Sequence, residues 1–194
     1  MFFPDFINTW DHRVLEWILT IRNPSLSLLF RFLTSLGNAS TVVILTCFVV
    51  GYFYYHKNYF HSFWFAITVI IPTVIINPLL KQIIHRPRPE EIYHLVSATS
   101  YSFPSGHSLG SVVVYGALAF LLMEHFPKEK KYSLGIWIFV GAFSFLIAMS
   151  RVYVGVHYLF DTIAGLSLGG FLLYQFIHLF YNNSIARKFK EDRK

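Results

Sequence analysis

From residue 39 onwards, long apolar runs alternate with short polar loops. The runs cover residues 39–55, 62–80, 107–126, 132–149 and 158–181. Each is close to the ~20 residues that a helix needs to cross a bilayer, once interfacial Tyr and Trp at the ends are allowed for. We therefore predict an all-α, multi-pass membrane protein with about five transmembrane helices.

Residues 1–38 have a weaker pattern, because their apolar stretch is interrupted by Glu16, Arg22, Asn23, Pro24 and Arg31. Proline breaks or starts a helix, and the residue before it favours extended geometry. We expect two short amphipathic helices at the membrane interface, joined at Asn23 and Pro24. One distorted spanning helix is the alternative. A turn is expected at Gly37 and Asn38.

The composition supports a membrane chain. Of the 194 residues, 55% are hydrophobic and 13% are charged, and that charged share is about half the share in soluble domains. We divide the chain into an interfacial segment (1–38), a transmembrane domain (39–181) and a basic tail (182–194). The formal net charge of +6 comes from loops and tail, so we expect anionic lipid head groups as partners and no nucleic acid.

Lysine and arginine are unevenly divided between the two ends of the runs. Nine of them fall in residues 56–61, 127–131 and 182–194, and seven fall on the opposite side. Four of those seven belong to one polar cluster. The positive-inside rule places the C-terminus in the cytoplasm and the cluster on the extracytoplasmic face of the cell membrane.

The polar cluster consists of three stretches, residues 81–89, 101–107 and 150–161. An even number of predicted crossings separates them, so all three can meet on one side of the membrane. Lys81, Arg88 and Arg151 bring three cations together with little negative charge besides Asp161. This arrangement favours a bound oxyanion over a metal cation.

The same stretches contain groups suited to phosphoryl transfer. Ser105 and Gly106 open a span, where a hydroxyl and free backbone amides bind anions. His107, one residue further, is placed to protonate a departing oxygen. His157 and Asp161 share one face if their helix begins near His157, so the carboxylate can orient an imidazole that attacks phosphorus.

Together these residues resemble the three-part signature of the type 2 phosphatidic acid phosphatase (PAP2) family, and the compact chain is similar to small bacterial members. The matching positions are Lys81, Arg88, Pro89, Pro104, Ser105, Gly106, His107, Ser150, Arg151, His157 and Asp161. The resemblance covers about residues 39–181 and implies that this is the catalytic domain. Family members usually have six spans, so residues 1–38 depart from the pattern.

The resemblance also implies the role of each residue. It implies that His157 becomes phosphorylated, that Asp161 orients it and that His107 is the general acid. The phosphoryl oxygens would be bound by Lys81, Arg88, Ser105, Gly106 and Arg151, with no metal and no cofactor. The implied substrate is a membrane lipid phosphate, with undecaprenyl diphosphate favoured by analogy over phosphatidylglycerophosphate and phosphatidic acid. The sequence carries no signal for an oligomeric state.

Other interpretations use the same residues. A metal-dependent hydrolase would bind its ion through His107, His157 and Asp161, but the surrounding cations disfavour it. The related vanadate-binding haloperoxidases are soluble, unlike this chain. An anion transporter would carry charge through the middle of several spans, and here the interiors of the runs are nearly free of charge. Next to the cluster, His85 and Arg86 are candidates for contact with a second phosphate or a head group.

Overall fold

The computed structural model describes residues 3–126 and 131–182. Within these ranges the chain is helical and contains no β-strand. The predicted basic tail lies outside the described residues beyond Asn182, and so do Lys128 and Lys130 of the loop that we assigned to the cytoplasm.

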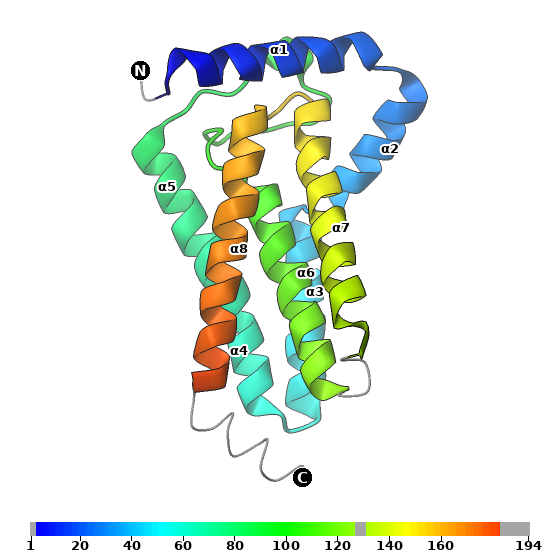
Figure 1. The fold of residues 1–194 in the computed structure, drawn as a ribbon, viewed down its shortest axis with the longest axis vertical. Coiled ribbons are helices and arrows are strands. Elements are labelled where there is room, and N and C mark those ends of the chain that lie inside the picture. Colours follow the sequence, from blue (N-terminus) through cyan, green and yellow to red (C-terminus); the bar gives the residue numbers. More distant parts are fainter. Residues whose placement is uncertain (1–2, 127–130, 183–194) are drawn as a thin grey trace.

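The helices form an elongated bundle with one helix lying across its end (Figure 1). Within the described residues, four helical stretches are long and apolar enough to cross a membrane: Tyr59–Ile84, Gly106–His125, Ser133–Tyr153 and Leu159–Asn182. A fifth crossing results if Pro24–Ser35 and Ala39–Tyr55, bent by 43°, act as one span. The predicted all-α membrane fold with about five spans is confirmed.

The N-terminal segment forms two helices, α1 (Asp5–Ile21) and α2 (Pro24–Ser35). The break falls where we predicted it, because Pro24 starts a helix and Asn23 is extended. The side chain of Asn23 caps α2 by accepting a hydrogen bond from the Leu26 backbone N–H at 2.9 Å.

The two N-terminal helices take different directions. α1 lies across the end of the bundle, whereas α2 runs obliquely along it toward α3 (Ala39–Tyr55) (Figure 1). Leu15 and Ile18 on the apolar face of α1 are buried. An interfacial position for the whole of residues 1–38 stays a prediction, since α2 and α3 together also fit one bent span.

The second span is longer than predicted and changes helix type along its length. It consists of α4 (Tyr59–Ile70), a π-helical segment η1 (Ile71–Ile76) and α5 (Asn77–Ile84). Pro72 lacks a helix donor, and the Thr73 hydroxyl donates to the Val69 carbonyl at 2.7 Å, so the helix widens locally. The added turn at the end of α5 carries Lys81, which is buried in the bundle.

Three helices, α6 (Gly106–His125), α7 (Ser133–Tyr153) and α8 (Leu159–Asn182), pack together in the bundle. At Gly165 of α8 an added Cβ would lie 2.6 Å from the Ser105 carbonyl oxygen. The absence of a side chain therefore lets the start of α6 approach α8 closely. This contact, together with the loops that converge under α1 (Figure 1), brings the three polar stretches to one end of the bundle.

Candidate active site

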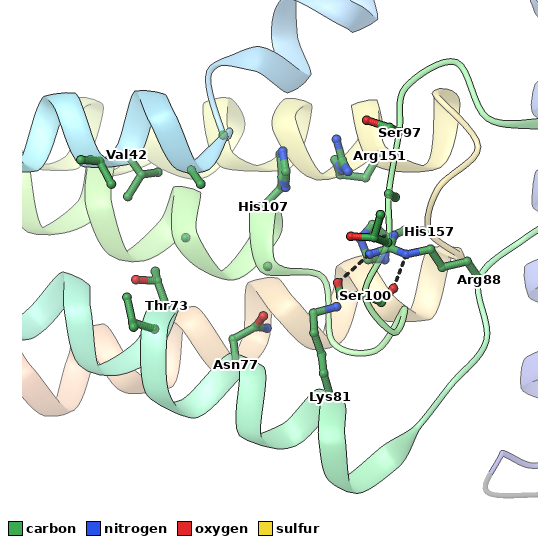
Figure 2. A pocket seen from close by; sticks show the side chains of 18 residues that line it. Val42, Thr73, Asn77, Lys81, Arg88, Ser97, Ser100, His107, Arg151 and His157 are labelled. Carbon is green, nitrogen blue, oxygen red and sulfur yellow. Dashed lines mark hydrogen bonds between the residues drawn. The ribbon is translucent and has the colours of Figure 1, made fainter. Parts of the chain in front are cut away.

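A cavity of about 370 Å³ lies at that end, among α3, α5, α6, α7 and residues 97–100. Six of the eight predicted site residues line it: Lys81, Arg88, Gly106, His107, Arg151 and His157 (Figure 2). Val42 and Thr73 also line the cavity, away from Arg88 and His157 (Figure 2). The cavity therefore joins a cationic region to a more apolar one.

His157 lies in the connection between α7 and α8, two residues before the start of α8. Its Nε2 atom is 3.2 Å from Nη1 of Arg88. A guanidinium group can only donate hydrogen bonds, so Nε2 must be the acceptor and carry a lone pair. The ring proton then resides on Nδ1, which faces Asp161 Oδ2 at 3.4 Å and Ser102 Oγ at 3.2 Å.

Burial lowers the pKa of His157 to about 3, although the hydrogen bond and negative charge of Asp161 act in the opposite direction. Arg88 and Arg151 lower it further by charge repulsion. The imidazole is therefore neutral at physiological pH. A neutral ring with no proton on Nε2 is the form that can act as a nucleophile.

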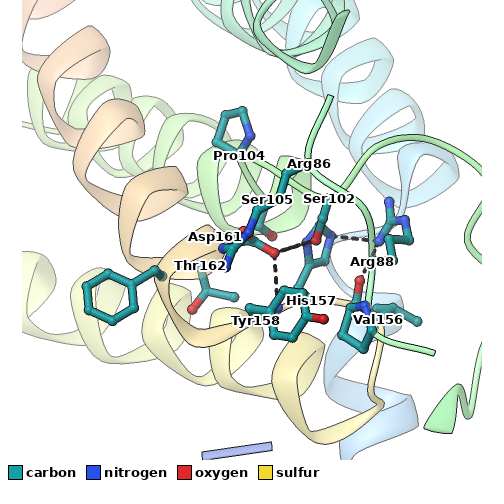
Figure 3. Close-up of polar contacts among 12 residues, drawn as sticks. Arg86, Arg88, Ser102, Pro104, Ser105, Val156, His157, Tyr158, Asp161 and Thr162 are labelled. Carbon is teal, nitrogen blue, oxygen red and sulfur yellow. Dashed lines mark hydrogen bonds and ion pairs between the residues drawn. The ribbon is translucent and has the colours of Figure 1, made fainter. Parts of the chain in front are cut away.

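Asp161, in the first turn of α8, is fully buried and accepts several hydrogen bonds (Figure 3). Its Oδ2 atom accepts from the Ser102 hydroxyl and from the Tyr158 backbone N–H at 3.0 Å. Oδ1 forms an ion pair with Nη1 of Arg86 at 2.5 Å. These contacts fix the carboxylate against the Nδ1 side of His157.

Arg86 is paired with carboxylates inside the protein. It is 5% exposed, and its guanidinium bridges two buried carboxylates, those of Asp11 and Asp161, at 2.5 Å each. The suggested contact with a second phosphate or head group stays a prediction for this residue, whose charge is already paired inside the protein. His85, by contrast, is exposed and stacks edge-on against Tyr101.

The three cavity cations differ in how far their donors are occupied. Nη1 of Arg151 donates to the Thr34 hydroxyl at 2.5 Å, while its buried Nε has no hydrogen-bond partner among the described residues. Lys81 Nζ donates to the carbonyls of Tyr101 and Ser102, which leaves one of its three N–H donors. Unused donors beside a cavity are suited to an anionic ligand.

Arg88 is held more completely than the other two cations. Its Nε atom donates to the Ser100 carbonyl at 2.5 Å and its Nη1 atom to the Val156 carbonyl at 2.6 Å. The guanidinium therefore stands beside His157 in a fixed orientation (Figure 2). A phosphoryl oxygen bound there would take the place of His157 Nε2 as acceptor.

His107 reaches the cavity from the first turn of α6. One of its ring nitrogens, Nε2, lies 2.9 Å from Oδ1 of Asn38, in the turn before α3. The amide oxygen can only accept a hydrogen bond, so Nε2 carries a proton. Asn38 thus orients the ring that we expect to act as general acid.

Ser105 and Gly106 occupy different positions at the start of α6. Gly106 lines the cavity, whereas Ser105 is buried outside it and serves as the N-cap of the helix. The Ser105 hydroxyl accepts hydrogen bonds from the backbone N–H and the hydroxyl of Ser108. Its part in phosphate binding stays a prediction. The Asn77 side chain donates to the carbonyl of Pro104, next to Ser105, at 3.2 Å.

Within residues 3–126 and 131–182, no three His, Cys, Asp or Glu side chains are grouped closely enough to bind a metal ion. The metal-site alternative required His107, His157 and Asp161 to converge. Instead, the His107 ring is paired with Asn38, and the Asp161 carboxylate is paired with Arg86 and Ser102.

Our reading of the sequence missed Ser102, Asn38 and Asp11. Ser102 stands within the stretch 101–107 that we selected, but nothing in the pattern distinguished its hydroxyl from that of Ser105. Asp11 had a detectable signal, because it lies at the spacing i, i+4, i+7 with Leu15 and Ile18 on the buried face of α1. An acid on the apolar face of a helix indicates a buried partner.

Comparison with protein families gives a match between residues 62–185 and the model of the PAP2 superfamily. The chain is 32% identical over 172 residues to phosphatidylglycerophosphatase B of Bacillus subtilis (strain 168), covering 87% of this chain and 82% of that protein. It is 43% identical over 74 residues to an undecaprenyl-diphosphatase of Sulfolobus acidocaldarius, a match that covers 38% of this chain and 31% of the relative.

The fold is also similar to that of a solved structure. The crystal structure of a transmembrane PAP2 type phosphatidylglycerolphosphate phosphatase from Bacillus subtilis superposes with a TM-score of 0.86 at 30% sequence identity. The superposition covers 92% of this chain and 88% of the other. The similarity therefore includes the N-terminal part of the chain as well as the matched residues 62–185.

Proposed function

The chain belongs to the PAP2 superfamily, and on that premise we propose that it releases phosphate from a membrane lipid through a phosphohistidine intermediate at His157. The observation that carries this proposal is the contact between His157 Nε2 and Arg88 Nη1. It directs the lone pair of a neutral imidazole into a cationic cavity, where a phosphoryl group would bind.

In the first step, the Nε2 lone pair attacks phosphorus and forms an N–P bond. The P–O bond to the lipid breaks, and its electron pair leaves with the lipid oxygen, which takes a proton from His107. The phosphorylated ring keeps its proton on Nδ1 and becomes positively charged. Asp161, which faces Nδ1, stabilises that charge.

In the second step, water attacks phosphorus and the N–P bond breaks, which returns the electron pair to Nε2. Neutral His107 takes a proton from the attacking water and so regains the proton that it gave to the lipid oxygen. Arg88, Arg151, Lys81 and the start of α6 at Gly106 would hold the phosphoryl oxygens. Each well-placed donor can contribute about 10²–10³ in rate, by analogy with oxyanion holes.

We propose that the reaction needs no metal ion. The cationic side chains of the cavity supply the positive charge that a divalent cation supplies in other phosphoryl-transfer sites. Activity that persists with excess EDTA is the expected result.

For the substrate, we propose phosphatidylglycerophosphate first and undecaprenyl diphosphate second. This order reverses the ranking made from the sequence, because the relative named phosphatidylglycerophosphatase B matches most of this chain, and the undecaprenyl-diphosphatase matches about a third. The apolar side of the cavity at Val42 and Val43 is suited to the part of the lipid next to the phosphate.

We further propose that the site faces the extracytoplasmic side, with the C-terminus in the cytoplasm.

The test is phosphate release by the purified protein in detergent with excess EDTA. Phosphatidylglycerophosphate, undecaprenyl diphosphate and phosphatidic acid are compared, and His157→Ala serves as the inactive control. We expect release from phosphatidylglycerophosphate in the wild type and a loss of at least about 10⁴-fold in the variant, as when other nucleophiles are removed. Wild-type activity in His157→Ala would overturn the proposed intermediate.

A further inference from the structure

Helix α1 is attached to both sides of the connection that carries His157. At its C-terminal end, the Arg22 guanidinium donates to the Tyr153 carbonyl, at 3.1 Å from Nε and 2.5 Å from Nη2, and to the Tyr93 carbonyl at 2.9 Å. Nearer its N-terminus, Asp11 Oδ1 accepts from the Phe160 backbone N–H at 2.9 Å. The turn between these two points depends on Gly155, which has a φ of +79° and stands so close to Tyr93 that a side chain has no room.

The attachment at Asp11 continues into the site through a chain of charged groups. Asp11 Oδ2 pairs with Arg86 Nη2 at 2.5 Å, and Arg86 Nη1 pairs with Asp161 Oδ1 at 2.5 Å. The other oxygen of Asp161 faces His157 Nδ1 at 3.4 Å. Asp11 is 1% exposed, Arg86 5% and Asp161 0%, so water screens these charges very little.

The charges of Asp11, Arg86 and Asp161 can be summed. Two carboxylates and one guanidinium carry a net charge of −1. Without the Asp11 carboxylate, the full positive charge of Arg86 would act on Asp161 alone, and the net charge would be zero. The cavity already contains the cations Lys81, Arg88 and Arg151, so the excess negative charge opposes them on the side of His157 where Nδ1 lies.

We propose that Asp11 is a positioning residue for phosphoryl transfer. Its carboxylate balances Arg86, so that Asp161 retains the negative charge that stabilises the phosphorylated, positively charged ring of His157. This inference rests on the proposed function of His157. It assigns to the N-terminal helix, which carries none of the family signature residues, an electrostatic share in catalysis that acts through Arg86 and Asp161.

Loss of the Asp11 charge should lower kcat and leave KM nearly unchanged. Asp11 does not line the cavity, so its charge has no contact with a bound substrate. The positive charge on the ring develops only as the N–P bond forms, so the effect of Asp11 falls on the chemical step. If α1 had a purely structural role, its variants would instead contain less folded protein, and their loss of activity would follow their loss of thermal stability.

The decisive variant is Asp11→Asn, which keeps the shape of the side chain and removes its charge. Glu16→Gln is the matched control, because Glu16 is exposed on the same helix and the change removes the same charge. Leu15→Ala is the control for weakened docking, because Leu15 is a buried apolar residue of α1. Each variant is assayed with phosphatidylglycerophosphate in detergent with EDTA, and its thermal unfolding is measured.

We expect Asp11→Asn to lower kcat by about 10- to 100-fold, the scale of a misplaced catalytic group, with KM changed less than about twofold. Glu16→Gln should match the wild type, and Leu15→Ala should lower the unfolding temperature with a smaller change in kcat. An Asp11→Asn enzyme with wild-type kcat overturns the inference. The inference is also overturned if Leu15→Ala loses as much kcat as Asp11→Asn when the two variants lose the same amount of stability.

Two further measurements cover the remaining outcomes. If Asp11→Asn does not fold, Asp11→Glu decides: kcat within about threefold of wild type supports the charge role, and a loss equal to that of Leu15→Ala overturns it. The Nδ1 proton resonance of His157 needs no turnover, and it should move upfield in Asp11→Asn as its bond to Asp161 weakens. A wild type that releases no phosphate would overturn the proposed function, whereas an unmoved resonance would overturn this inference.

Discussion

Nε2 of His157 lies 3.2 Å from Nη1 of Arg88, and in this pair only the histidine can accept a hydrogen bond. The contact therefore fixes the tautomer of the ring: the lone pair faces the cavity and the proton faces Asp161. A histidine that is to attack phosphorus needs this arrangement before the substrate arrives, because reorienting the ring would add to the barrier.

We predict that His157 remains neutral when the pH is lowered from 8 to 5. Its pKa is lowered from the ordinary 6.5 to about 3, so the folded protein does not take up this proton until strongly acidic pH. The unfolded chain takes it up near pH 6.5, so this residue makes stability fall as the pH drops below that value. Ring ¹⁵N shifts, assigned by comparison with His157→Ala, measure the state, and a midpoint near 6.5 would contradict the prediction.

His107→Ala should slow hydrolysis most for poor leaving groups. A lipid alkoxide needs a proton as it departs, so we expect a loss of about 10²–10⁴ in kcat with a phospholipid. A phenyl phosphate bearing a nitro group leaves without that help and should lose much less. The ratio of the two losses is the measurement, and Asn38→Ala, which removes only the hydrogen-bond partner of the ring, should give a smaller ratio. Equal losses for both substrates would exclude His107 as the general acid.

Arg151→Lys should reduce kcat/KM by about 10²–10³, the cost of losing one oxyanion donor at other sites. Lysine keeps the charge but lacks the buried Nε–H that has no hydrogen-bond partner within the described residues. Thr34→Val is the matched control, because it removes the Nη1 contact and leaves Arg151 in place. Steady-state kinetics should separate the two variants clearly, and a lysine variant as active as the control would show that Nε is not used.

Ser102 and Ser105 should respond differently to replacement by alanine. Ser102→Ala removes a donor to Asp161, so we expect about a tenfold loss in kcat, equivalent to ~1.4 kcal/mol, with little change in stability. Ser105→Ala removes an N-cap and should cost about 0.5–2 kcal/mol of stability, with KM unchanged. A raised KM in Ser105→Ala would instead support its predicted role in phosphate binding.

The spans could be predicted well where apolar runs end in clear polar loops. The run at residues 39–55 corresponds to α3, because His56 and Lys57 end it. The second and fourth runs were predicted too short, by four residues at the C-terminal end in each case. Those extra turns carry Lys81 and Arg151, whose charged ends are buried in the bundle, and a hydropathy pattern treats such residues as the end of a span.

The site was predictable only as far as its residues share a motif. The signature positions identified His157, His107 and the three cavity cations, five residues that line one cavity. Asp11 belongs to no motif and meets Arg86 across 75 positions of sequence. Its pairing depends on how α1 lies across the bundle, which follows from the packing of Leu15 and Ile18 and from the Arg22 contacts, and a sequence pattern does not specify such a docking.

The position of α1 sets an order for assembly of the enzyme in the membrane. The Asp11 carboxylate can accept from the Phe160 backbone only after Phe160 has been synthesised, 149 residues later. His157 is synthesised just before the last span. The contacts of α1 with Arg86 and Tyr93 can form earlier, whereas those with Tyr153 and Phe160 become possible only when α7 and the first turn of α8 have been made. Under the proposed mechanism, activity can begin only when α1 has met the start of α8, so a chain cut off before α8 lacks the contacts that hold His157 in its proposed place.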